Sequence, residues 1–162
     1  MSRPRTWPEP LTGELRGDAQ AGRADPCGLA GFKPERSGWL KPENRCLAPA
    51  TSFCEHLPEK PAIPHWFALG PERPLFAFAG ILRPWQGLRG KVDRVHELFA
   101  FLTTDANAVV APIHRKAMPV ILTTQEECES WMTTPMLETL CLQRPLPDGF
   151  LSVVAIGAKQ DG

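Results

Sequence analysis

The chain has 162 residues, of which 43% are hydrophobic, and its eighteen basic residues balance eighteen acidic ones. This length and apolar content suit a single globular domain with one hydrophobic core. The balanced charge excludes the overall positive field of a strongly basic nucleic-acid binder, although a local basic groove remains compatible with it.

The first 38 residues contain six glycines and five prolines, and the first valine or isoleucine in the chain is Ile63. Such a segment has few side chains that can offset the entropy of ordering. We therefore expect residues 1–37 to form a divergent, loose lead. The alternative is a long ordered loop laid over the core, with Trp7 and Phe32 as its anchors.

The residue pattern changes from Trp39 onward, where short apolar or alternating runs are separated by turns rich in glycine and proline. These runs predict strands over residues 65–69, 74–82, 96–104 and 151–157. Thr124 and Glu127 have capping-box spacing, which predicts a helix over residues 125–132, and a second short helix is expected over residues 135–142. The sequence thus predicts a single α+β domain, mainly antiparallel β with a barrel-like core and a few short helices.

The five cysteines are odd in number and scattered, which argues against a disulfide framework and a zinc ribbon. A mixed cluster of Cys46, Cys54, Glu55, His56 and His65 matches no standard zinc spacing, so we expect neither a metal nor a cofactor. The chain has neither an apolar segment after its N-terminal cations nor a run of membrane-spanning length. We expect a cytoplasmic protein with no membrane partner.

Glu55 and His114 are the two candidates for catalytic residues. Glu55 follows an apolar stretch, where partial burial would raise its pKa and suit it to acid–base work, but a solvated glutamate at a strand end fits equally well. His114 lies between Pro112 and Pro119, where it could transfer protons while Arg115 and Lys116 hold a phosphate. The alternative for His114 is a turn residue with a structural hydrogen bond.

Four ordered blocks decide between these alternatives: NRCLAPATSFCE (44–55), PLFAFAGIL (74–82), FLTTDANAVVAPIHRKAMPVIL (101–122) and TTQEECESWM after it. In this order they resemble the SOS response-associated peptidase (SRAP) family. The resemblance implies a SRAP-like domain over residues 38–158, followed by a tail over residues 159–162. It also implies a protein of the SOS response to DNA damage that binds single-stranded DNA with abasic sites.

In the family, removal of the initiator methionine exposes a cysteine, and its amine and thiol condense with the open-chain sugar to form a DNA–protein crosslink. The resemblance places the family's catalytic glutamate on Glu55 and its histidine on His114. The amine needs a nearby base and the sugar ring oxygen needs a proton donor, so both residue types suit the chemistry. Arg115 or Lys116 would contact the DNA backbone, and Trp39 would stack on a base.

The N-terminal part departs from the family pattern, because residue 2 is Ser2 and the family's first strand is missing. A hydroxyl is a poor substitute for a thiol in this condensation. We therefore expect a truncated or crosslink-deficient member of the family, acting as a monomer in the bacterial cytosol and associated with the nucleoid on damage. Cleavage before Cys27 would restore a terminal cysteine. A noncatalytic fold remnant or a protein-interaction module is the alternative from another functional class.

Overall fold

The computed structural model describes residues 40–159, and all elements discussed below lie in that range. The predicted lead (residues 1–37), Ser2, Cys27 and Trp39 lie outside the described residues. In chain order the elements are η3 (Pro42–Asn44), β1 (Arg45–Ala50), β2 (Phe53–His56), β3 (Pro64–Ala68), β4 (Phe76–Arg89), β5 (Val92–Phe101), β6 (Thr103–Thr104), β7 (Met118–Pro119), β8 (Ile121–Leu122), α1 (Gln125–Thr133), α2 (Met136–Thr139), η4 (Leu140–Leu142) and β9 (Ser152–Ile156).

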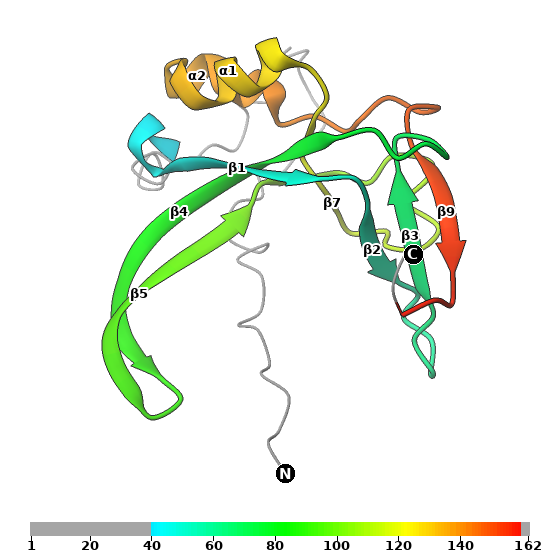
Figure 1. The fold of residues 1–162 in the computed structure, drawn as a ribbon, viewed down its shortest axis with the longest axis horizontal. Coiled ribbons are helices and arrows are strands. Elements are labelled where there is room, and N and C mark those ends of the chain that lie inside the picture. The colour runs from blue at the N-terminus through cyan, green and yellow to red at the C-terminus, as the bar shows by residue number, and fades with distance from the viewer. Residues whose placement is uncertain (1–39, 160–162) are drawn as a thin grey trace, which may run out of the picture.

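The described strands form three antiparallel sheets (Figure 1). β4 is central to the first sheet, where it pairs with β1, β5 and β8. β3 lies between β2 and β9 in the second sheet, and β6 pairs with β7 in the third. The predicted fold class, α+β and mainly antiparallel, is confirmed, while the strand pairing among the described residues forms separate sheets that do not close on themselves.

Alternate residues of β4 pack in two different apolar clusters, one on each side of its sheet. Ala79 and Ile81 belong to the cluster that contains Trp131 of α1. Phe76 and Phe78 belong to the other cluster, which contains Phe67 of β3 together with Val110, Met118 and Ile121. A strand that is buried on both faces needs apolar residues at consecutive positions. This explains why residues 76–81 form an unbroken apolar run.

Beyond residue 81, β4 continues with β5 as a hairpin that bends away from the rest of the molecule (Figure 1). Residues 82–89 pair only with residues 92–99, and we call these two segments the hairpin arm. Arg89 pairs with Val92, which leaves a two-residue turn at Gly90 and Lys91. Gly90 has a φ of 66°, a left-handed conformation that glycine adopts without a steric penalty.

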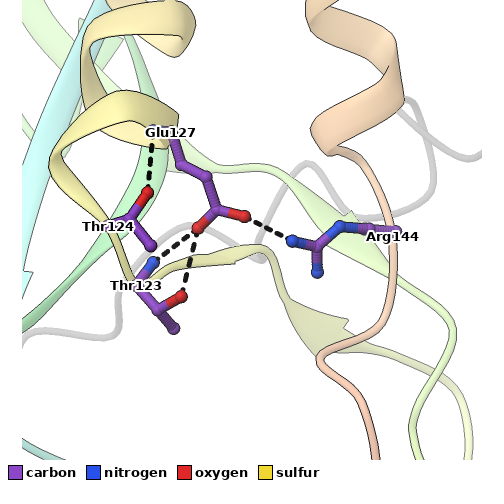
Figure 2. A network of polar contacts seen from close by, with 4 residues as sticks. All are labelled: Thr123, Thr124, Glu127 and Arg144. Carbon is purple, nitrogen blue, oxygen red and sulfur yellow. Dashed lines mark hydrogen bonds and ion pairs between the residues drawn. The ribbon is translucent and has the colours of Figure 1, made fainter.

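Helix α1 begins at the residue that the sequence predicts. Oγ1 of Thr124 accepts the Glu127 backbone N–H at 3.2 Å, the first half of the expected capping box. The Glu127 carboxylate, however, accepts from the backbone N–H of Thr123 at 2.7 Å instead of that of Thr124, and it also pairs with Arg144 (Figure 2). Glu127 therefore ties the start of α1 to the chain beyond η4.

The other predicted elements are partly confirmed. The strands expected at 65–69 and 151–157 are β3 and β9, and the second helix is split into α2 and η4. The strand expected over 96–104 begins earlier, at Val92, and is interrupted at Leu102. Leu102 instead exchanges backbone hydrogen bonds with Ala79 and Val120, which breaks the regular ladder. Cys46, Cys54 and Cys128 are free thiols, whereas Cys141 is disulfide-bonded.

Candidate active site

Strand β2 holds Glu55 at the edge of an apolar cluster. Glu55 lies opposite His65 in the register between β2 and β3. Phe53 precedes it by two residues and therefore shares its side of the strand. The Phe53 ring stacks on Phe67 with a centroid distance of 5.2 Å and meets Phe78 edge-on at 5.8 Å. Because Phe53 is fixed in this cluster, the Glu55 side chain is directed toward the interior and is only 27% exposed.

A compact turn over residues 108–113 positions His114, and Asn107 organises that turn. Oδ1 of Asn107 accepts the backbone N–H groups of Val109 at 3.2 Å and Val110 at 3.0 Å, which is an Asx-turn. Nδ2 of Asn107 donates to the carbonyl of Leu146 at 3.0 Å. Val110 is fully buried, and its carbonyl accepts the backbone N–H of His114 at 2.8 Å. The turn is thus held by a satisfied buried amide and an apolar anchor.

The fold brings the two predicted catalytic residues together, although they are far apart in the sequence. Nδ1 of His114 is shielded from solvent and lies 3.2 Å from Oε2 of Glu55, without the alignment of a linear hydrogen bond. The His114 side chain is 39% exposed, so the rest of its ring can reach a ligand. The solvated strand-end alternative for Glu55 does not describe this arrangement.

Burial raises the pKa of Glu55 above its ordinary value, and the nearby His114 and His56 oppose this shift only in part. A carboxylate with a raised pKa is a stronger base than a solvated one, and it costs less to protonate near neutral pH. The pair therefore combines a partly buried carboxylate with an accessible imidazole. Such an arrangement can accept a proton at one atom and donate one at another.

The remaining predicted residues have less defined surroundings. Arg115 and Lys116 are exposed on the turn that follows His114. No group of three or more His, Cys, Asp or Glu side chains within residues 40–159 has the geometry to hold a metal ion. His65, which the mixed cluster would include, instead has Nδ1 3.1 Å from the carbonyl of Ile63.

Asn107 is the residue of this site that the sequence reasoning missed. The available signal was an asparagine immediately before a short segment that contains Pro112, since asparagine side chains commonly bond to the backbone two residues onward. The sequence alone does not reveal that Asn107 also reaches Leu146, because this contact joins segments that are distant along the chain.

The family model for the SOS response associated peptidase (SRAP) matches residues 37–158. The chain belongs to the SRAP family. A crystal structure of a Bacteroides thetaiotaomicron protein matches with 30% sequence identity and a TM-score of 0.59, over 78% of this chain and 54% of that one. One from Bordetella bronchiseptica matches with 20% identity and a TM-score of 0.59, over 86% of this chain and 72% of that one, which supports the fold. No curated protein matched.

This SRAP chain thus spans about half the length of the Bacteroides protein. The description of the family names the SOS response and a peptidase. Within the described residues, none of the helices combines the length and apolar character needed to cross a membrane.

Proposed function

We propose that this SRAP protein binds single-stranded DNA that carries abasic sites and acts on the sugar through Glu55 and His114. The observation that carries the proposal is the 3.2 Å contact between Oε2 of Glu55 and Nδ1 of His114, made by residues from two separate segments of the domain. The protein works as a monomer in the cytosol, at sites of DNA damage, through a SRAP domain over residues 38–158.

Opening of the abasic sugar requires two proton movements, and the pair has one group for each. Protonated His114 donates a proton to the ring oxygen as the bond between C1′ and that oxygen breaks. Glu55 accepts the proton of the C1′ hydroxyl as it becomes an aldehyde. Glu55 then releases its proton to water, and Nε2 of the partly exposed His114 ring takes one from water, which restores both groups. Burial keeps Glu55 basic enough for this role, because its pKa is raised.

The cations after His114 supply the second element of the proposal. Arg115 and Lys116 are exposed and adjacent to the catalytic pair, so they contact the phosphates beside the abasic nucleotide. This chain lacks a cysteine at position 2, where Ser2 offers a hydroxyl of much higher pKa. We therefore infer that, with Ser2 at this position, the chain opens and holds the abasic sugar without forming the stable crosslink of family members that carry a cysteine there.

The ring-opening step can be measured with an abasic oligonucleotide and an excess of methoxyamine, which traps the aldehyde as an oxime. At a saturating concentration of methoxyamine, the rate of trapping reports the rate of ring opening. We expect the protein to accelerate trapping at least tenfold, in view of the usual contribution of general acid–base catalysis. Glu55→Gln and His114→Asn should each remove the acceleration, whereas Glu59→Gln, an exposed carboxylate on the loop after β2, should not. Equal rates with and without the protein would refute the proposed chemistry.

The lack of a crosslink is tested separately on a denaturing gel. After incubation with the abasic oligonucleotide, boiling should release all of the DNA. A covalent band that survives boiling would contradict the inference, and peptide mapping to Ser2 or Cys27 would then identify the nucleophile. If Glu55→Gln and His114→Asn change only thermal stability and leave trapping unaffected, the noncatalytic alternative is correct.

A further inference from the structure

The hairpin arm has two faces of different chemistry, which follow from its unbroken antiparallel register. Residues that pair directly lie on the same face, and the faces alternate along each strand. Both acidic residues of the arm, Asp93 and Glu97, pair with Leu88 and Pro84 and thus lie on one face. We call this the acidic face.

The opposite face carries cations and an aromatic pair. Trp85 pairs with His96, and Arg94 pairs with Gly87, two residues after Trp85, so these four residues share a face with Arg83. We call this the tryptophan face. Arg94 is exposed and is separated from both acids of the arm by the thickness of the sheet, so it presents a positive charge to a ligand.

Trp85 lies flat on this face. A Cβ atom added at Gly87 would stand 2.3–2.9 Å from three carbons of the indole, so the ring lies directly over the backbone of this glycine. On the neighbouring strand, the His96 ring lies beside it with a centroid distance of 5.9 Å and an interplanar angle of 33°. Gly87 thus leaves room for the indole to rest on the sheet. Trp85 is still 44% exposed, and its outer surface is open to solvent.

An open aromatic surface beside cations fits one chemical class of ligand especially well. Nucleic-acid bases in a single strand stack on such rings, and the phosphates of the strand bind the adjacent cations. Bases in a duplex are already stacked on one another and cannot reach the indole. An acidic or purely apolar partner would use only one of the two features of the tryptophan face.

The tryptophan face is distinct from the Glu55–His114 site. At the base of the arm, this face continues into Ile81, which packs in the cluster of α1. Phe78 and the turn residues Val110 and Ile113 belong to the cluster on the other side of the sheet. The arm thus offers a contact that the catalytic pair does not supply.

We propose that the tryptophan face of the hairpin arm is a second binding site for single-stranded DNA, with Trp85 as a stacking platform and Arg94 as a phosphate contact. It holds nucleotides that flank the abasic site, and in that respect it rests on the proposed function. It does not need an abasic site itself, because every base has a face that can stack. The site therefore binds intact single strands.

The test is fluorescence anisotropy with a labelled oligothymidylate that contains no abasic site. Trp85→Ala should weaken binding by roughly 5- to 150-fold, the range expected from the loss of one base–aromatic stack, and Trp85→Phe should retain most of the affinity. Phe99→Ala is the matched control, since Phe99 is an aromatic residue of the acidic face with 50% exposure. Arg94→Gln should reduce the slope of log affinity against log salt by about 0.7.

Circular dichroism melting curves establish that each variant is folded, and if Trp85→Ala is not, Trp85→Phe and Arg94→Gln carry the test. Unchanged binding by Trp85→Ala, or an equal loss in Phe99→Ala, would overturn the proposal. Binding to a duplex of the same length should not depend on Trp85.

The trapping assay with methoxyamine is independent of these measurements. A protein that traps abasic aldehydes but binds oligothymidylate equally well with Trp85→Ala refutes the second site alone, and the reverse result refutes the catalytic proposal alone.

Discussion

Replacement of Arg45 should strongly destabilise the domain. Arg45 is only 5% exposed, and its guanidinium donates to the carbonyls of Leu40 at 2.7 Å, Trp131 at 2.6 Å and Thr134 at 2.8 Å. It also donates to Oγ1 of Thr139 at 3.0 Å. All four acceptors are neutral, and burial lowers the pKa of Arg45. One buried cation therefore connects the start of the described chain to the end of α1 and to α2.

Two opposing terms determine the size of the effect. In Arg45→Met, the carbonyls of Leu40 and Trp131 stay buried and lose their donor, at a cost of about 1–3 kcal/mol each. The hydrogen bonds to Thr134 and Thr139 are lost as well. Against this, methionine avoids the desolvation of a charge, which costs several kcal/mol in a protein interior. Because Arg45 already satisfies several backbone groups at once, we expect a net loss of about 3 kcal/mol.

The measurement is urea denaturation followed by circular dichroism, with the free energy of unfolding taken from the midpoint and the slope. Lys41→Met is the matched control, because the neighbouring Lys41 side chain is 62% exposed and should change the stability by less than about 0.5 kcal/mol. Arg45→Lys should also lose stability, since an ammonium group cannot reproduce the planar geometry of these hydrogen bonds. An Arg45→Met variant as stable as the parent would show that desolvation of the charge dominates and would refute the reasoning.

Three further predictions concern α1 and the site. Glu127→Gln should lose about 1–2 kcal/mol in the same urea assay, since it weakens the contacts to Thr123 and removes the ionic attraction to the partly exposed Arg144; an unchanged midpoint would contradict this. Asn107→Ala should lose about 2–3 kcal/mol and also the proposed trapping activity, because the turn before His114 loses its buried amide; full activity would argue against this positioning role. The folded-state pKa of Glu55 is raised, so the contribution of this group to stability is lost as the pH rises through that pKa. Glu55→Gln should therefore be more stable than the parent at pH 7–8 and lose this advantage in acid. An equal advantage at pH 3 and pH 8 would contradict the burial of the Glu55 carboxyl group.

Local signals predicted the elements that depend on local interactions. The cap of α1 is formed by Thr124 and Glu127, which are close in the sequence. The apolar run of β4 indicates that this strand is buried on both faces. The hairpin arm was not predicted between residues 83 and 95, because Pro84, Gly87 and Gly90 resemble turn residues. In the structure Gly87 instead leaves space for an indole from the same strand. A glycine that makes room for a neighbouring ring cannot be distinguished from a turn glycine by sequence pattern alone.

The candidate site was predicted through two residues, and the structure explains why a local pattern was insufficient. Glu55 owes its burial to β2 and to the stacking of Phe53 on Phe67, which depends on the pairing of β2 with β3. The backbone turn before His114 depends on Asn107. Neither the 3.2 Å contact nor the raised pKa of Glu55 can be read from residues adjacent in the sequence.

The two apolar clusters divide stability and site geometry between the two sides of the β4 sheet. Phe53 and Val110, which hold the segments of Glu55 and His114, both belong to the cluster around Phe67. Trp131 and the helix that carries it belong to the other cluster. Loss of packing on the helix side should therefore lower the free energy of unfolding while Glu55 and His114 keep their geometry in the folded protein. Loss of packing around Phe67 acts on both, because the distance between the carboxylate and the imidazole is set by the same side chains that fill this half of the core.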